Sequence, residues 1–513
     1  MQSFQRRKLL KSMAMIGAFG TLRPFAAWAT SNTVLPQLPG GKFYGDFLVH
    51  NELPLALEIR RSRAGFGPLT SISKLFVRNN LPMPPPSIND VPDNWELEVV
   101  GAARTETLSV RELKSLDIAS VATVLQCSGN GRAFFAHKPS GSPWELGAAG
   151  CVLWTGVPVS AVIEHLGGPK NAEASFLTAL GGEQLPPGVN PNDVAVERSV
   201  PLQKGLQDCL LAWEMNGQPL SLVHGGPLRL IVPGYFGVNN VKWLKRLSLT
   251  LEQSGTRIQQ SGYRVRPIGE AVSTEHPSMW RMPVKSWLNG PGADGEPVLH
   301  GSAVLYGVAF SGERGITKVE VSGDEGSTWK DASFIGPDLG KNAWRAFILQ
   351  VDLVAGQQRF VSRATDADGD RQPRDRSEND RGYSHNGWLD AALEMTVVKQ
   401  LPEQEESVRV AVEAAPPEPL VASATEALEL SAAARLGKSL YTNGTQPGCG
   451  VCHTLKDAGS TGAVGPNLDV IEPSISQLKV AITNGVGIMP AFGEQLSADE
   501  VEALATYINE ATR

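Results

Sequence analysis

The chain has 513 residues, of which 42% are hydrophobic and 19% charged, and its formal net charge is −7. This composition is typical of an ordinary globular protein long enough for about three domains, and it excludes a basic nucleic-acid-binding chain. Five cysteines are few for a disulfide-stabilised protein. Two of them, Cys151 and Cys209, lie in apolar runs and predict buried thiols, with a disulfide between them as the alternative.

The N-terminus has the pattern of an export signal. Residues 3–11 read S-F-Q-R-R-K-L-L-K, an apolar run follows over residues 13–22, and residues 27–29 read A-W-A, an A-x-A cleavage pattern. The apolar run is too short to span a bilayer. The paired arginines favour twin-arginine export over an ordinary leader for unfolded chains. We therefore predict a signal peptide over residues 1–29 and a periplasmic mature protein without a membrane anchor.

The next stretch predicts an α+β domain preceded by an extension. Residues 30–75 are mixed in pattern and are expected to wrap the following domain. Residues 76–280 alternate short strands, Gly/Pro-rich loops and a few helices, such as one expected over Val159 to Leu166.

The pattern changes from residue 281 to short alternating strands. Val304 to Phe310, Ile316 to Ser322 and Trp344 to Val351 are separated by turns rich in Gly and acidic residues, which predicts a β-sandwich over residues 281–398. Residues 366–370 read D-A-D-G-D, similar to a calcium loop. Because the glycine is misplaced and the later glutamate is missing, we predict a hairpin turn there.

The C-terminal part predicts a linker followed by a small helical domain. Residues 399–428 are rich in Pro, Ala and Glu and poor in aromatics, as flexible linkers are. Helical spacing over Leu430 to Tyr441, Ser474 to Thr483 and Ala498 to Ala511 predicts an all-α domain over residues 429–513.

This domain contains the haem-attachment sequence Cys449-Gly450-Val451-Cys452-His453. Its two thiols bind haem covalently and His453 supplies an axial ligand, whereas a zinc site would need two further ligands that the segment lacks. Met489 is the only methionine of the segment, so it is the candidate second axial ligand, with a core methionine as the alternative. The segment resembles class I cytochrome c domains, which implies that the Pro466 carbonyl accepts a bond from the His453 ring.

A further cysteine stands at a predicted strand end. An apolar run from Val121 leads to Cys127, the chain turns on Gly129 and Gly131, and Arg132 follows. A thiol is thereby presented beside a cation, although a lone cysteine at a strand end is often only a small buried hydrophobe.

The stretch Q-C-S-G-N-G-R around Cys127 resembles the Q-C-[AS]-G-N-x-R motif of the sulfite oxidase family of molybdenum enzymes. Further matches follow in the family's order: F-V-R-N-N-L-P at 76–82, W-E-L-G-A-A-G-C-V-L-W-T-G at 144–156, M-N-G at 215–217, H-G-G-P-L-R at 224–229, V-P-G at 232–234 and V-K-W-L at 241–244. The resemblance spans about residues 76 to 398. It implies molybdenum held by Cys127 and the dithiolene of one pyranopterin, and an immunoglobulin-like second domain that forms a homodimer.

The resemblance also implies the site residues. For the sulfite pocket they are Arg78, Arg132, Trp144, Tyr263 and Arg381, and for the pyranopterin they are Phe76, Val77, Asn79, Asn80, His224, Arg229, Asn240 and Lys242. Guanidinium suits sulfite because it keeps its proton, although any one arginine can instead form a surface salt bridge. The chain departs from the family at Asn80, where many members have histidine, at Gly131 and Asn239, where arginine is common, and by lacking a lysine before Trp144.

Together these features predict a periplasmic sulfite dehydrogenase that passes electrons through its own haem to an external cytochrome c or similar acceptor. The alternatives are a sulfane dehydrogenase acting on carrier-bound sulfur and a non-catalytic electron-carrier module. Residues 401–513 hold 6 Lys and Arg against 15 Asp and Glu, a formal charge of −9, while residues 30–400 sum to −3. Net charge therefore gives no docking force, and we expect a tethered haem unit that swings, with a docked unit as the alternative.

Overall fold

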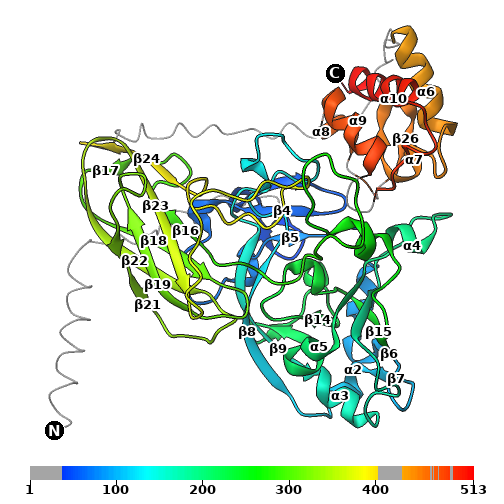
Figure 1. Cartoon of the computed structure of the whole chain (residues 1–513), viewed down its shortest axis with the longest axis horizontal. Helices are drawn as coiled ribbons and strands as arrows, with labels where there is room; N and C mark the ends of the chain where they lie inside the picture. The colour runs from blue at the N-terminus through cyan, green and yellow to red at the C-terminus, as the bar shows by residue number, and fades with distance from the viewer. Residues whose placement is uncertain are drawn as a thin grey trace, which may run out of the picture.

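The computed structural model describes residues 37–401, 430–462, 465, 467–471, 473–485 and 489–512. The predicted signal peptide, nearly all of the predicted linker and Pro466 lie outside these residues. Within the described ranges, no helix combines the length and the hydropathy that crossing a bilayer requires. The chain folds as an α+β unit, a β-sandwich and a small helical unit (Figure 1).

The N-terminal extension joins the other units instead of standing apart. After the short pair β1 (Gln37–Leu38) and β2 (Lys42–Phe43), strands β3 (Phe47–Asn51), β4 (Ala56–Ile59) and β5 (Val77–Arg78) form an antiparallel sheet. Pairing of Ala56 with Arg78 fixes the position of that arginine. Arg61 then donates to the backbone oxygens of Leu288, Ala392 and Ala391 at 2.6, 2.8 and 2.7 Å, which ties the extension to the sandwich.

The α+β unit contains two five-stranded arrangements. One sheet has the order β11-β10-β15-β6-β7, and the other has the order β13-β12-β9-β8 with β14 paired to β12. The strands are β6 (Glu96–Val100), β7 (Glu106–Ser109), β8 (Ala119–Gln126), β9 (Ala149–Pro158), β10 (Phe176–Gly181), β11 (Glu197–Pro201), β12 (Leu210–Met215), β13 (Gln218–Pro219), β14 (Arg229–Ile231) and β15 (Leu244–Thr250). The helices are α2 (Val110–Leu113), α3 (Val159–His165), α4 (Pro191–Val194) and α5 (Leu202–Asp208), with α3 matching the predicted helix.

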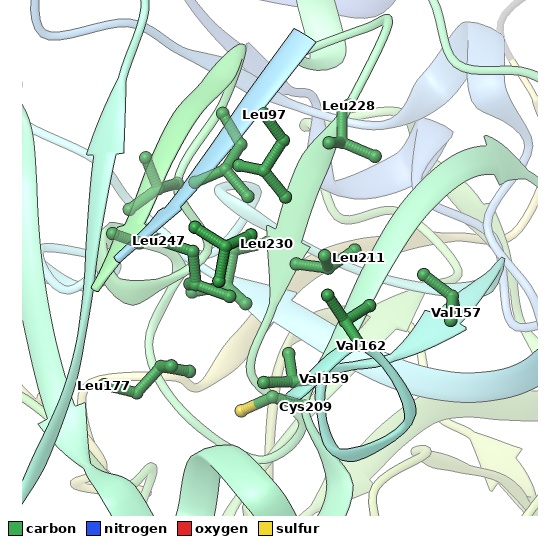
Figure 2. Close-up of a cluster of buried hydrophobic side chains, with 14 of the residues drawn as sticks. Leu97, Val157, Val159, Val162, Leu177, Cys209, Leu211, Leu228, Leu230 and Leu247 are labelled. Carbon is green, nitrogen blue, oxygen red and sulfur yellow. The ribbon is translucent and has the colours of Figure 1, made fainter. Parts of the chain in front are cut away.

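Leucine and valine side chains from both sheets and from α3 form the core of this unit. Figure 2 shows Leu97, Leu177 and Leu247 of one sheet meeting Leu211 and Leu230 of the other. Cys209 lies in the same core, and both it and Cys151 are free and buried, so the predicted buried thiols are confirmed. Burial raises the pKa of Cys151 to about 12, which keeps that thiol protonated and inert.

The predicted β-sandwich is observed as two sheets, β16-β18-β22-β21 and β17-β24-β23-β19-β20. The strands are β16 (Lys285–Gly290), β17 (Val298–Leu299), β18 (Gly301–Phe310), β19 (Ile316–Ser322), β20 (Lys330–Asp331), β21 (Ser333–Ile335), β22 (Arg345–Leu353), β23 (Gly356–Asp366) and β24 (Leu393–Val398). Apolar residues of both sheets, including Phe347, Phe360 and Leu393, fill the space between them.

The acidic loop of the sandwich is a turn, as predicted. Arg314 lies 3.1, 3.6 and 2.5 Å from carboxylate oxygens of Asp366, Asp368 and Asp370. A guanidinium therefore neutralises the carboxylates that a calcium ion would need. No group of three His, Cys, Asp or Glu suited to a metal ion occurs in the part of the chain that the structure describes.

The C-terminal unit contains α6 (Ala432–Asn443), α7 (Cys449–Cys452), α8 (Leu468–Ile471), α9 (Ile475–Asn484) and α10 (Ala498–Ala511). Helices α9 and α10 each begin with a serine capping box, at Ser474 and Ser497. The all-α prediction was wrong in one detail, because β25 (Thr454–Leu455) pairs with β26 (Ser460–Thr461). Gly459, with φ +62°, supplies the left-handed residue that reverses the chain between them.

Replacing Arg61 tests whether the extension fastens the sandwich. Arg61→Met should lower the free energy of unfolding by about 2–4 kcal/mol, because three backbone oxygens lose a charged donor. Chemical denaturation followed by tryptophan fluorescence measures the change. Arg63→Met is the matched control, since the Arg63 side chain is 53% exposed. Equal stability of the two variants would show that Arg61 does not fasten the units.

Candidate active site

A cavity of about 640 Å³, which includes solvent at its mouth, lies at the end of β8. Its lining brings together residues that are far apart in the sequence and that sequence analysis had singled out. These are Phe76, Arg78, Asn79, Asn80, Cys127, His224, Arg229, Asn240, Lys242 and Tyr263. The cavity is therefore the common site that the motifs predicted.

The Cys127 loop is held from both sides. The Cys127 N–H donates to the Ala148 oxygen at 2.9 Å, and the Cys127 oxygen accepts from the Asn130 N–H at 3.0 Å. Gly131 has φ +104°, and a Cβ there would overlap the His385 ring. This explains the departure at position 131, since an arginine does not fit the loop. The half-buried Cys127 thiol is thus presented to the cavity on a fixed backbone.

Arg132 and Arg381 lie beside the cavity but do not line it. Arg132 is buried, and it donates from Nε to the Arg381 oxygen at 3.0 Å and from Nη1 to the Ser142 oxygen at 2.9 Å. Burial lowers the pKa of Arg132, and the nearby Arg381 lowers it further. The Arg381 Nη1 donates to the Gly485 oxygen of the C-terminal unit at 3.3 Å.

Two tyrosines connect these arginines to the cavity. Tyr263 and Tyr383 stack with ring centroids 5.4 Å apart and an interplanar angle of 11°. The guanidinium carbons of Arg132 and Arg381 lie 5.3 and 5.9 Å from the Tyr383 ring centroid. Burial raises the pKa of Tyr263 to about 12, so its hydroxyl stays a donor, and it donates to Asn80 Oδ1 at 3.3 Å.

Trp144 is fully buried behind the cavity wall. Its ring meets those of His50 and Phe76 edge-on, with centroids 4.7 and 6.5 Å apart. Its indole N–H has no hydrogen-bond partner among the described residues. The predicted contact of Trp144 with substrate therefore depends on a ligand that reaches this unused donor.

Two buried cations, Lys242 and Arg229, lie among the residues that the sequence predicted to bind pyranopterin. Lys242 donates to Asn79 Oδ1 and to the Val223 oxygen at 2.6 and 2.8 Å, and burial lowers its pKa well below the usual value. Arg229 donates to the His224 and Asn240 oxygens at 2.8 and 3.1 Å, and burial lowers its pKa to about 9.

His224 completes this group as a neutral imidazole. Burial, together with the cations Lys42, Lys242 and Arg229, lowers its pKa well below the usual value. His224 Nε2 and Asn79 Nδ2 have no partner among the described residues although both atoms are buried. Buried cations and unused polar atoms around one cavity fit an anionic ligand that is rich in acceptors, such as a phosphorylated pterin.

Two positions that sequence analysis singled out are not part of the cavity lining. Val77 does not line the cavity, because strand alternation turns its side chain into the core with Phe47 and Leu57. Asn239, where arginine is common in the family, is a buried structural residue that accepts from Arg198 at 3.2 Å and donates to the Met279 oxygen at 2.8 Å.

Several residues near the cavity were not named by sequence analysis. Glu183 faces the cavity, and burial raises its pKa to about 8. Arg198 lies fully buried, 5.8 Å from the Tyr263 ring centroid. Tyr383 lies inside the motif that contains Arg381, so that motif could have identified it. Arg257 immediately precedes a short helix over residues 258–262 and lies close to Arg381.

The haem-attachment residues lie together at the C-terminal unit. Cys449 and Cys452 begin and end α7, and burial raises the pKa of Cys449 to about 11. Both Cys449 and Met489 pack against the core of this unit. Gly465 lies so close that a Cβ there would overlap the His453 ring. A thiol pair, an imidazole and a thioether around one core fit a covalent haem.

Comparisons with known families match three parts of the chain. Residues 82–258 match the "Oxidoreductase molybdopterin binding domain", residues 276–396 the "Mo-co oxidoreductase dimerisation domain", and residues 432–508 "Cytochrome C oxidase, cbb3-type, subunit III". With the geometry above, these matches identify the cofactors as one molybdenum-pyranopterin and one covalent haem c.

The relatives include sulfite oxidases. The chain is 33% identical to human mitochondrial sulfite oxidase over 332 residues, covering 61% of this chain and 59% of that protein. It is 33% identical to chicken (Gallus gallus) sulfite oxidase over 321 residues, covering 60% of this chain and 68% of that protein. The crystal structure of the sulfane dehydrogenase SoxCD from Paracoccus pantotrophus shares the fold, with TM-score 0.54 and 24% identity, covering 71% of this chain and 86% of that one.

Removing one buried cation tests the pyranopterin assignment. Lys242→Met should lower the molybdenum content about 10-fold or more, because the anionic cofactor loses a buried charge-assisted contact. Metal analysis measures molybdenum, and the haem absorption of the same sample gives the amount of protein. Lys245→Met is the control, since Lys245 instead packs over the Trp95 ring at 3.6 Å. Full molybdenum in Lys242→Met would remove Lys242 from the cofactor site.

Proposed function

We propose that this chain, which belongs to the sulfite oxidase family of molybdenum enzymes, is a periplasmic sulfite dehydrogenase. It oxidises sulfite to sulfate and passes the electrons through its own haem to an external cytochrome c or similar acceptor. The carrying observation is that one cavity is lined by Cys127, by Arg78 and Tyr263, and by the buried cations Arg229 and Lys242.

In this proposal some residues of the cavity bind the cofactor and others bind the substrate. Cys127 would hold the metal, and Lys242, Arg229, His224 and Asn79 would hold the pterin and its phosphate. When bound, the molybdenum centre supplies oxygen-atom transfer with two electrons, and the haem carries these onward one at a time. The protein's own part is to bind, orient and neutralise the substrate.

Arg78 and Tyr263 are the groups that would contact sulfite directly. A guanidinium keeps its charge at every pH of interest and offers two parallel donors to an oxyanion. The Tyr263 hydroxyl stays protonated because burial raises its pKa to about 12, so it adds a neutral donor. Trp144, Arg132 and Arg381 lie beside the cavity and not in its lining, and we propose that they contribute to sulfite binding from there, with Arg132 also fixing the backbone of residue 381.

The remaining assignments support export and assembly. The paired arginines and the A-x-A pattern support a signal peptide over residues 1–29, and covalent haem is consistent with a periplasmic enzyme. The match to a dimerisation domain supports a homodimer through residues 281–398. We keep the domain limits proposed from sequence, with the molybdopterin domain over residues 76–280 and the cytochrome domain over residues 429–513.

Purified protein tests the function directly. Mixing sulfite with the oxidised enzyme, without any carrier protein, should reduce the bound haem, which is followed by its absorption. Haem that stays oxidised with free sulfite but is reduced by a sulfur-loaded carrier protein would instead show a sulfane dehydrogenase. A preparation that binds haem but no molybdenum when cofactor is supplied would show an electron carrier only.

Changing the metal-binding thiol separates the two redox centres. Cys127→Ser should abolish sulfite turnover while leaving the haem spectrum unchanged, because only the molybdenum site loses a soft ligand. Turnover with an external cytochrome c measures the loss. Cys151→Ala, which removes a buried thiol away from the cavity, should keep turnover. Substantial activity in Cys127→Ser would exclude Cys127 as the metal ligand.

Changing the cavity arginine tests substrate recognition. Arg78→Gln should raise KM for sulfite about 10-fold, because a charge-assisted contact becomes neutral, and the increase should be larger at alkaline pH, where sulfite carries two charges. KM measured across pH gives the result. Arg111→Gln on the exposed face of α2 is the control. A KM for Arg78→Gln that matches the control at every pH would contradict the role.

A further inference from the structure

The cytochrome unit contacts the region of the cavity through one glycine. Arg381 Nη1 donates to the Gly485 oxygen at 3.3 Å. A Cβ built on Gly485 would overlap Nη2 of Arg257, so a second guanidinium packs against the Gly485 backbone. Gly485 is the residue at which α9 ends. In Figure 1 the helical unit meets the α+β unit on its α8 and α9 side.

The contacted backbone adjoins the predicted haem ligand. Gly485 has φ +67°, and its Cβ would also overlap the Met489 oxygen and lie 2.8 Å from the Pro490 carbonyl carbon. Gly485 therefore packs directly onto the backbone of Met489 and Pro490. Whatever fixes Gly485 also fixes the backbone that carries the Met489 thioether.

The two arginines form a local positive site. Both guanidinium groups lie at Gly485, and burial together with the neighbouring Arg381 lowers the pKa of Arg257 to about 10. Like charges held together favour an acidic partner. The cytochrome domain over residues 429–513 supplies one, since it holds 5 Lys and Arg against 9 Asp and Glu, a formal charge of −4.

The site is also joined to the cavity. The backbone oxygen of Arg381 accepts from Arg132, and the Arg381 guanidinium lies 5.9 Å from the Tyr383 ring centroid. Tyr383 stacks on Tyr263, which lines the cavity. Packed side chains thus run without interruption from the cavity to Gly485.

We propose that Arg257 and Arg381 form a docking site for the Gly485 end of the segment that carries Met489, holding the cytochrome unit beside the molybdenum cavity for electron transfer. The inference rests on the proposed function in one respect, that the haem receives its electrons from that cavity. Arg257 is a positioning residue in this proposal, and it acts on the haem unit without touching substrate.

Amide hydrogen exchange tests docking without any turnover. In the oxidised full-length protein, free of sulfite, Arg257→Gln should raise the exchange of amides in residues 473–485 and 489–492 about 10-fold, because the guanidinium that packs against Gly485 is lost. Arg111→Gln on α2 should leave the same amides unchanged. Equal exchange in the two variants would overturn the proposal.

Electron transfer gives a second, separate readout. Arg257→Gln should slow the reduction of haem by sulfite about 10-fold while its molybdenum content matches that of Arg111→Gln. A rate equal to that of Arg111→Gln would overturn the coupling of docking to electron transfer. If sulfite reduces the haem of no variant, the proposed function fails, and the exchange measurement still decides the docking site.

A glycine pair tests the partner side of the contact. Gly485→Ala should reproduce the exchange and rate changes, because its methyl group would collide with the Arg257 guanidinium as well as with the Met489 oxygen. Gly459→Ala carries similar backbone strain, with φ +62°, but its methyl group has no atom within 4 Å. Haem absorption shows whether axial ligation is kept. Identical behaviour of the two alanine variants would assign the effect to strain and overturn the contact.

Discussion

Positive charge buried around one cavity is the constraint on which the rest of this structure depends. Lys242 and Arg229 are buried without a bond to any carboxylate of the described residues, and backbone oxygens of residues 223, 224 and 240 accept their donors instead. Removing such ions from water costs several kcal/mol each, and carbonyl dipoles recover only part of that cost. Glu183 faces the same cavity, but burial raises its pKa to about 8, so it offers little negative charge near neutrality. The fold is therefore completed by an anionic ligand that reaches these cations.

The sandwich does more than enlarge the protein, because its longest loop completes the site. The loop between β23 and β24 returns to the α+β unit, where Asn379 accepts from the Tyr383 N–H and donates to the Tyr383 oxygen, both at 2.9 Å. This rigid loop places Tyr383 against Tyr263 and places the Arg381 oxygen on Arg132. The three hydrogen bonds from Arg61 to the sandwich backbone fix the position of the sandwich relative to the rest of the chain. The arrangement of side chains beside the cavity and the packing between units thus rely on the same few residues.

Local patterns could be predicted from sequence, and long-range pairings could not. Helices α3, α9 and α10 were predicted closely because apolar spacing is a local signal. Cys127, Arg78 and His224 were identified because each lies in a short motif. Arg198 carried no such signal, since a single arginine in a strand is typical of a surface position, and its burial is set by Ile258 and Asn239, which lie 60 and 41 residues away. For Val77 the motif match did not show which way the strand side chain points, and its contact with the pterin stays a prediction.

Net charge was a poor guide to docking because two arginines at one point outweigh a dispersed charge of −3 over residues 30–400. The contact of Gly485 with Arg257 and Arg381 is small enough to allow the haem unit to move. A flexible tether gives an effective concentration on the order of millimolar. If the docked contact had a Kd of about 0.1 mM, the unit would be docked for about nine-tenths of the time. With association at about 10⁶ M⁻¹s⁻¹, such a contact would open about 100 times each second. Docking for electron transfer from the cavity and release toward an external acceptor can therefore alternate within ordinary turnover times.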